Sequence, residues 1–225
     1  MTLMIEVSEV SFYTEEGRAV FEDLRLRVEW GEWLLLLGPP GSGKTVFLKL
    51  LWGELRPSRG QILVDERNVT RLGPARLRQL RRTLGILPDR PISLNQETVM
   101  AGLVFKLRAL GLPPDEAERR AAETLEGLGL AELAGRVQEE LNATEQALSQ
   151  LALAVCHDPI LLLADEPYRG LDEAGTLAVL SLLDRLRRRR RLTMVVTAEE
   201  VRPADRFGPR ILLIKEGCLE EVKVK

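Results

Sequence analysis

The chain has 225 residues and a formal net charge of −2, with 29% charged residues. Its length allows one large α/β unit with a full core, and its near-neutral charge does not indicate a nucleic-acid partner. No apolar run approaches the ~20 residues of a membrane-spanning helix. The N-terminus lacks the regions of a signal peptide, and two cysteines without metal or disulfide spacing fit a reducing compartment. We therefore expect a cytoplasmic protein that meets any membrane from its surface.

The N-terminal third reads as strands around one glycine-rich loop. Residues 4–12 and 24–30 alternate apolar and polar side chains, as strands with one solvated face do. A turn at Gly31 leads into the apolar run 33–37, which predicts a buried strand. The octapeptide Gly38-Pro-Pro-Gly-Ser-Gly-Lys-Thr45 follows it and opens a helical pattern.

This octapeptide has the spacing G-x-x-x-x-G-K-[ST] of a phosphate-binding loop, in the strand–loop–helix context that the motif requires. Gly41 and Gly43 let backbone N–H groups approach phosphate oxygens without a Cβ in the way. Lys44 reaches the β- and γ-phosphates, the Thr45 hydroxyl is placed to bind Mg²⁺, and the following helix points its positive end at the anion. A nucleoside triphosphate is therefore expected on residues Gly38, Pro39, Pro40, Gly41, Ser42, Gly43, Lys44, Thr45 and Val46.

The chain then becomes helical before its β/α pattern resumes. Short strands are predicted at 61–64 and 84–87, and helices follow at 98–110, 114–128 and 143–157. The later elements are a strand, a helix, two strands and a hairpin turn, at 160–164, 173–189, 193–197, 210–215 and Gly217. We expect one domain over 1–225, with a β/α core and antiparallel N-terminal sheet from 1–87 and 158–225 and a helical subdomain at 88–157.

The apolar strand at 160–164 ends in two carboxylates, Asp165 and Glu166. Ligands of parallel sheets sit beyond the carboxyl ends of the strands. Asp165 is therefore placed to hold Mg²⁺ through water, and Glu166 to orient and activate the attacking water. Ordinary solvated acids are the alternative at a strand end, but the phosphate loop upstream favours the site.

In this order, the elements resemble the ATP-binding subunit of an ABC transporter over essentially the whole chain. The resemblance implies an α/β P-loop NTPase fold of the ABC ATPase type, two subunits that sandwich two ATP molecules, and a membrane permease docked near the helical subdomain. It also implies Asp172 in Tyr168-Arg-Gly-Leu-Asp172 as the D-loop aspartate, and an aromatic, Tyr13 or Phe12, stacked on adenine. Segments 69–72, 80–85 and 162–167 look most like the cell-division ATPase of the FtsE type and its lipoprotein-release relatives.

The family signature L-S-G-G-[QE] falls on Leu141-Asn-Ala-Thr-Glu145 and is altered there. Ala143 and Thr144 place a Cβ where two glycines let backbone N–H groups approach the γ-phosphate of the partner's ATP. Asn142 can still offer an amide donor to the nucleotide. Asn142 and Glu145 also have the spacing of a capping box, so the next helix is expected to begin normally.

Other positions depart from the family pattern as well. Asp89 takes the place of the γ-phosphate-sensing glutamine, as an anion facing an anion, and Ala198 that of the switch histidine. Val46 replaces a hydroxyl residue after the Mg²⁺ ligand. His157 is read as a C-terminal residue of the signature helix. The run Arg187–Arg191 is read as a solvated helix end, with contact to anionic lipid headgroups as the alternative.

Two functions of different classes stay open. The first is a working ATPase with ATP and Mg²⁺ that powers an FtsE-like or transporter complex from the inner face of the cell membrane, hydrolysing slowly or only with its partner. The second is a hydrolysis-poor regulatory or structural subunit, as half of a heterodimer with an intact relative. The retained Glu166 favours the first and the altered signature the second. We expect the first on family resemblance, as a homodimer or heterodimer, with an integral-membrane permease and no nucleic acid.

Overall fold

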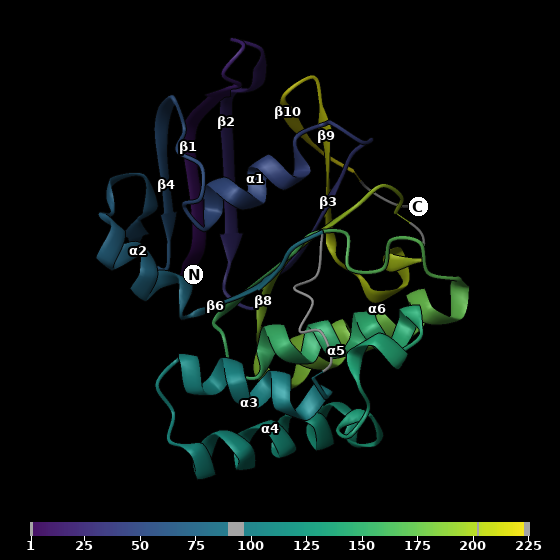
Figure 1. Ribbon diagram of the computed structural model, residues 1–225. Coiled ribbons are helices and arrows are strands. Elements are labelled where there is room, and N and C mark those ends of the chain that lie inside the picture. The colour runs from purple at the N-terminus through teal and green to yellow at the C-terminus, as the bar shows by residue number, and fades with distance from the viewer. Residues whose placement is uncertain (1, 90–96, 202, 223–225) are drawn as a thin grey trace.

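The computed structural model describes residues 2–89, 97–201 and 203–222. Two sheets form its frame (Figure 1). The smaller sheet is antiparallel, in the order β2-β1-β4-β5. Its strands are β1 (Leu3–Tyr13), β2 (Ala19–Glu29), β4 (Arg59–Val64) and β5 (Arg67–Asn68). The predicted N-terminal antiparallel sheet is confirmed, and β5 is a further strand that the sequence did not predict.

The larger sheet has six strands in the order β10-β9-β3-β8-β7-β6. Its strands are β3 (Trp33–Leu37), β6 (Leu84–Leu87), β7 (Leu161–Ala164), β8 (Thr193–Ala198), β9 (Arg210–Lys215) and β10 (Cys218–Glu221). All pairs are parallel except β9–β10. The carboxyl ends of β3, β6, β7 and β8 therefore meet at one edge of the sheet, where ligands of such sheets bind.

Every residue of β3 is buried, because both faces of the large sheet are covered. Trp33, Leu35 and Leu37 point into one apolar cluster, which we call the helix-side cluster, and Leu34 and Leu36 point into the other, the strand-side cluster. The strand-side cluster holds α1 (Lys44–Leu51) between the two sheets (Figure 1). The phosphate loop is thus fixed between a central strand and a buried helix.

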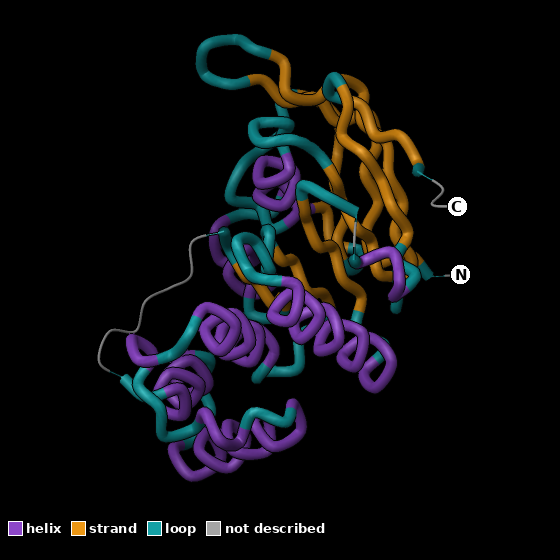
Figure 2. The backbone as a smooth tube through the Cα atoms, turned by 90° about the vertical axis from the view of Figure 1, so that its right-hand side faces the viewer, coloured by secondary structure: helices purple, strands orange, loops and turns teal. Residues whose placement is uncertain are grey.

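Four helices lie on the opposite face of the large sheet, where Figure 2 shows them gathered. They are α3 (Val99–Ala109), α4 (Pro114–Leu128), α5 (Ala143–Val155) and α6 (Glu173–Arg190). All four predicted helices are confirmed to within two residues at each end. Residues 90–96 of the expected helical subdomain lie outside the described residues. Within the described ranges, no helix combines the length and the apolarity needed to cross a bilayer.

One helix, α2 (Pro74–Arg81), escaped the sequence analysis. It is mostly polar and buries only Leu77 and Leu80, so its apolar periodicity is weak. The better signal was Pro74 at its first position, where proline is favoured. Arg81 fixes its end by donating to the carbonyl oxygens of Trp52 and Gly53, at 2.9 and 2.8 Å.

The two basic features near helix ends differ from their expected roles. His157 lies beyond α5, which ends at Val155, and its Nε2 is 3.1 Å from the Leu84 carbonyl oxygen. Burial lowers the pKa of His157 to about 4, and nearby Lys106 acts in the same direction. In the arginine run, Arg187 lies 5.7 Å from the Trp33 ring centroid and 3.0 Å from Asp184. This arginine therefore packs on the core, which neither the solvated nor the lipid-contacting reading expected.

Candidate nucleotide-binding site

The glycines of the phosphate loop meet two different demands. Gly43 has φ 106, and a Cβ there would come within 2.8 Å of Val20 Cγ1 and 2.9 Å of Phe21 Cζ. Gly41 has φ 77, but no atom lies within 4 Å of the position a Cβ would take. Both backbones favour glycine because side chains rarely adopt this region. The space beside Gly41 is open for a ligand, whereas Gly43 is packed against β2.

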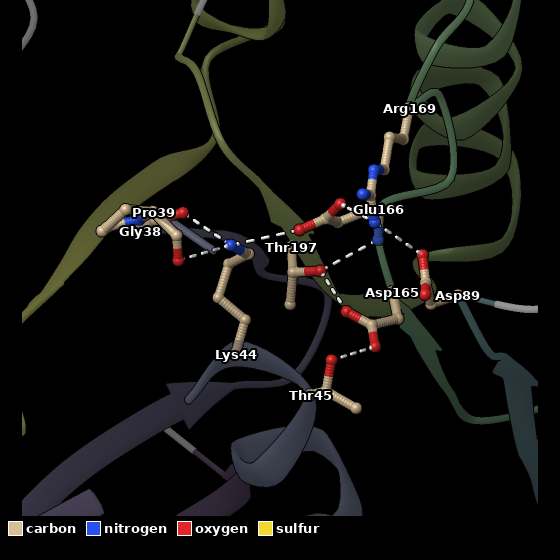
Figure 3. A network of polar contacts seen from close by, with 9 residues as sticks. All are labelled: Gly38, Pro39, Lys44, Thr45, Asp89, Asp165, Glu166, Arg169 and Thr197. Carbon is tan, nitrogen blue, oxygen red and sulfur yellow. Dashed lines mark hydrogen bonds and ion pairs between the residues drawn. The ribbon is translucent and has the colours of Figure 1, made fainter. Parts of the chain in front are cut away.

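The ammonium of Lys44 is held on three sides (Figure 3). Its Nζ donates to the carbonyl oxygens of Gly38 and Pro39, at 2.5 and 3.2 Å, and lies 3.1 Å from Glu166 Oε1. Three acceptors match the three donors of an ammonium group. Because the Lys44 side chain is only 5% exposed, phosphate oxygens can reach it only by replacing one of these partners.

Asp165 joins the loop to the neighbouring strands. Thr45 Oγ1 donates to Asp165 Oδ2 at 2.6 Å, and Thr197 Oγ1 donates to Asp165 Oδ1 at 2.7 Å. The Thr45 hydroxyl and the Asp165 carboxylate are oxygen donors in direct contact, which suits Mg²⁺, since this ion is held by one or two carboxylates together with substrate phosphates. The residues predicted to bind the metal therefore fit the ion.

Thr197 is a site residue that the sequence analysis missed. Besides bonding to Asp165, its Oγ1 accepts the backbone N–H of Glu166 at 2.9 Å. Glu166 has φ 48, a strained conformation for a residue with a side chain. The Thr197 bond thus fixes the backbone that carries the predicted base. A buried hydroxyl near the carboxyl end of β8, a mostly apolar strand beside β7, was the available signal.

Asp89 does not face the site as an isolated anion. Arg169 Nη1 donates to Asp89 Oδ1 at 3.2 Å and lies 3.3 Å from Glu166 Oε2 (Figure 3). From the sequence, Asp89 was expected to be an anion facing an anion, and Arg169 had no expected role. That expectation was wrong, because the Arg169 guanidinium places a cation between the carboxylates of Asp89 and Glu166.

An open cavity of about 640 Å³ lies beside these carboxylates. Asp89, Asp165, Glu166 and Arg169 line it from the ends of β6 and β7, and Ala143 lines it from the first turn of α5. The two carboxylates at the end of β7 and Ala143 of the altered signature therefore open onto one space.

The model of the family described as ABC transporter matches residues 21–169. The chain belongs to the ABC transporter family. The predicted family and fold class are confirmed, and the family is that of the ABC-type ATPases. A curated relative, the methionine import ATP-binding protein of Thermobifida fusca, is 34% identical over 93% of this chain and 66% of its own length. The cell division ATP-binding protein FtsE of Mycobacterium tuberculosis is 32% identical over 96% of this chain and 94% of its own.

Solved ATP-binding cassettes share the fold of this ABC chain. One, described as a dimeric post-hydrolysis state bound to ADP and Pi, has a TM-score of 0.85 and 25% identity over 99% of both chains. Another, CbiO1 of Clostridium perfringens, has a TM-score of 0.89 and 22% identity, covering 98% of this chain and 88% of its own, and it shows the fold alone. The chain spans just under two thirds of the first methionine import relative.

In the altered signature of this ABC chain, the predicted capping box is confirmed. Asn142 Oδ1 accepts the Glu145 N–H, and Glu145 Oε2 accepts the Asn142 N–H, both at 2.9 Å. Asn142 and Ala143 are exposed on this first turn. Thr144 packs against Gly175, and a Cβ added to Gly175 would collide with the Thr144 Oγ1 atom. The N–H of Gly175 donates to Asp172 Oδ1 at 2.8 Å. Within the described residues, Asn142 and Asp172 thus cap helices, and their predicted contacts with nucleotide stay predictions.

The switch position, Ala198, is buried in the helix-side cluster at 3% exposure. Its carbonyl oxygen accepts the Gly38 N–H at 3.3 Å. An imidazole placed here would overpack the core, so the position offers no ready place for a histidine.

Tyr13→Ala is expected to weaken ATP binding by ~1–3 kcal/mol, the value of a base–aromatic stack. Tyr13 is 40% exposed, and its hydroxyl donates to Glu22 Oε1 at 3.2 Å. Phe12 is instead half-buried against the strand-side cluster. Titration calorimetry with ATP should show the loss for Tyr13→Ala and little change for Phe12→Ala. The reverse order would assign the stacking contact to Phe12.

Proposed function

We propose that this chain is the ATP-binding, slowly hydrolysing subunit of a membrane-associated ABC complex of the transporter or FtsE-like type. One observation carries the proposal. The predicted base Glu166 contacts the phosphate-loop lysine at 3.1 Å, and Asp165 contacts Thr45 at 2.6 Å. These contacts support the proposal, because they bring the predicted base, the predicted metal-binding residues and the phosphate loop together in an arrangement suited to phosphoryl transfer to water.

In this proposal each residue has one task. Lys44 and the loop N–H groups bind the phosphates, and Thr45 and Asp165 hold the metal. When bound, Mg²⁺ neutralises charge that develops on the phosphate oxygens. Glu166 orients and deprotonates the attacking water, and the carboxyl edge of β7 keeps it beside the loop.

The partners follow from the family. We propose a dimer in which each chain's signature turn covers the nucleotide on the other chain, coupled to an integral-membrane permease. The dimeric description of a solved cassette and the import and cell-division names of the relatives support this. The subunit then works at the inner face of the cell membrane, with the segment at 88–157 as its helical subdomain.

A second candidate is a hydrolysis-deficient regulatory subunit paired with an intact relative. The observation in its favour is Ala143, exposed on the first turn of α5 with its Cβ toward the shared cavity. A methyl group there hinders the close approach of another chain's phosphate.

Phosphate release by the purified chain separates the two candidates. A slow ATPase is expected to turn over ATP below ~1 s⁻¹, the lower end of ordinary turnover numbers. Glu166→Gln should lower this rate at least tenfold while ATP binding persists. Glu126→Gln, at an exposed position of α4, is the matched control and should keep the parent rate. Equal rates for parent and Glu166→Gln would favour the regulatory candidate, and a parent rate near ~10 s⁻¹ would contradict weak hydrolysis.

A further inference from the structure

The Glu166 carboxylate lies between two cations (Figure 3). Its Oε1 is 3.1 Å from Lys44 Nζ, and its Oε2 is 3.3 Å from Arg169 Nη1. The Glu166 side chain is only 10% exposed, so the pair of cations compensates a largely buried charge. A position where two cations converge on one small anion is also a position that can receive another anion.

A nucleotide phosphate is the anion that must enter this position. The loop backbone cradles the α- and β-phosphates, and the loop lysine reaches the β- and γ-phosphates. In the structure, Glu166 holds one side of the Lys44 ammonium. A phosphate oxygen that takes the place of Glu166 Oε1 beside Lys44 lies close to Arg169, because the other oxygen of the same carboxylate contacts Arg169. ADP lacks the outermost phosphate, so it brings one anion fewer toward Lys44 and Arg169.

Arg169 is built to take up such a phosphate. A guanidinium has five N–H donors in a planar fork, so one arm can keep its partner while others bind phosphate oxygens. Arg169 Nη1 donates to Asp89 at 3.2 Å, and the two side chains are 59% and 42% exposed, which leaves room to turn. Asp89 follows β6 and Arg169 follows β7, and these strands pair directly, Leu87 with Ala164. The paired ends of β6 and β7 therefore hold the backbones of Asp89 and Arg169 close to each other.

We propose that Arg169 recognises the γ-phosphate of ATP in this chain and that Asp89 positions it. The inference rests on the proposed function, because it requires nucleotide on the phosphate loop. ATP then displaces Glu166 from Lys44, and Arg169 contacts the same phosphate from the opposite side. This role explains why Asp89 stands in the place of the family's glutamine: its carboxylate anchors the Arg169 cation.

The test compares the non-hydrolysable ATP analogue AMP-PNP with ADP, both with Mg²⁺, by titration calorimetry. Arg169→Ala should raise the Kd for AMP-PNP about tenfold, the loss of a charge-assisted hydrogen bond, and change the Kd for ADP less than twofold. Arg169→Lys should restore part of the preference, because it keeps the charge without the fork. Asp89→Asn keeps the acceptor oxygen but removes the charge that anchors Arg169, so it should lower the preference by less than Arg169→Ala does.

The matched control is Arg119→Ala. Arg119 is 60% exposed, pairs with Glu123 on α4 and is absent from the described lining of the cavity. It should leave both Kd values unchanged.

An Arg169→Ala variant that keeps the parent's preference for AMP-PNP and hydrolyses ATP faster would overturn the inference, because Arg169 would then only restrain Glu166. Equal losses for Arg169→Ala and Asp89→Asn would also overturn it, since the pair would then be a structural tether. A parent chain that binds neither nucleotide would instead refute the proposed function.

Discussion

Lys44→Ala is expected to weaken ATP binding by about 1.5–3 kcal/mol, the value of a hydrogen bond to a charged group, or roughly 10- to 150-fold in Kd. The side chain is 5% exposed and its ammonium is directed into the site by two carbonyl oxygens and Glu166. Titration calorimetry with ATP and Mg²⁺ measures the change. Unchanged affinity would refute the assignment of the phosphate loop.

Two controls separate binding from folding in this experiment. Lys49→Ala, on the same helix, removes a partly exposed lysine whose Nζ lies 2.8 Å from Glu54 Oε1, so it should leave affinity unchanged. Lys44→Ala also leaves Glu166 without one of its cations, and breaking a buried pair is destabilising. Urea unfolding should therefore show reduced stability for Lys44→Ala. The double variant Lys44→Ala/Glu166→Ala should recover stability but not affinity.

Restoring the signature is expected to raise ATP turnover at least tenfold. The variant Asn142→Ser/Ala143→Gly/Thr144→Gly removes two Cβ atoms from the first turn of α5. Backbone N–H groups can then approach a partner's γ-phosphate, and one such donor is worth ~10²–10³ in rate in other enzymes. Serine keeps the cap on this helix, whereas each glycine costs it ~1 kcal/mol. Phosphate release measured across a series of protein concentrations reports the gain.

The gain should grow with protein concentration, because in the proposed dimer each signature acts on the nucleotide of the other chain. Adding Glu166→Gln should abolish it. Ala198 is best left unchanged, because a histidine there would overpack the helix-side cluster and confuse the result. Turnover equal to that of the parent at every concentration would show that the altered signature does not limit this chain.

The sequence was sufficient wherever the signal is local. The phosphate loop, the apolar strand before Asp165 and the Asn142–Glu145 capping box each depend on residues within a few positions of one another. Local patterns of this kind depend on the conformation of a few consecutive residues, so the sequence predicts the local backbone structure. Helix α2 was missed because it lacks such a local pattern: its Arg-rich sequence has little apolar periodicity.

The missed parts of the site depend on residues far apart in the chain. Arg169 meets Asp89 across 80 positions, and Thr197 meets Asp165 across 32. Both pairs form only because β6, β7 and β8 are neighbours in the large sheet. No spacing rule predicts which arginine faces a given aspartate, so the charge at Asp89 was judged without its partner.

The helix-side cluster makes the helical segment and the sheet a single unit in folding. Side chains from α3, α4, α5 and α6 share it with Leu35, Leu162 and Val196 of the central strands. Cutting out the segment at 88–157 would therefore expose the apolar surface that α3, α4 and α5 share with the sheet, although α6 would stay in place. Denaturation should then be cooperative, with the helices and the central strands losing hydrogen-exchange protection together.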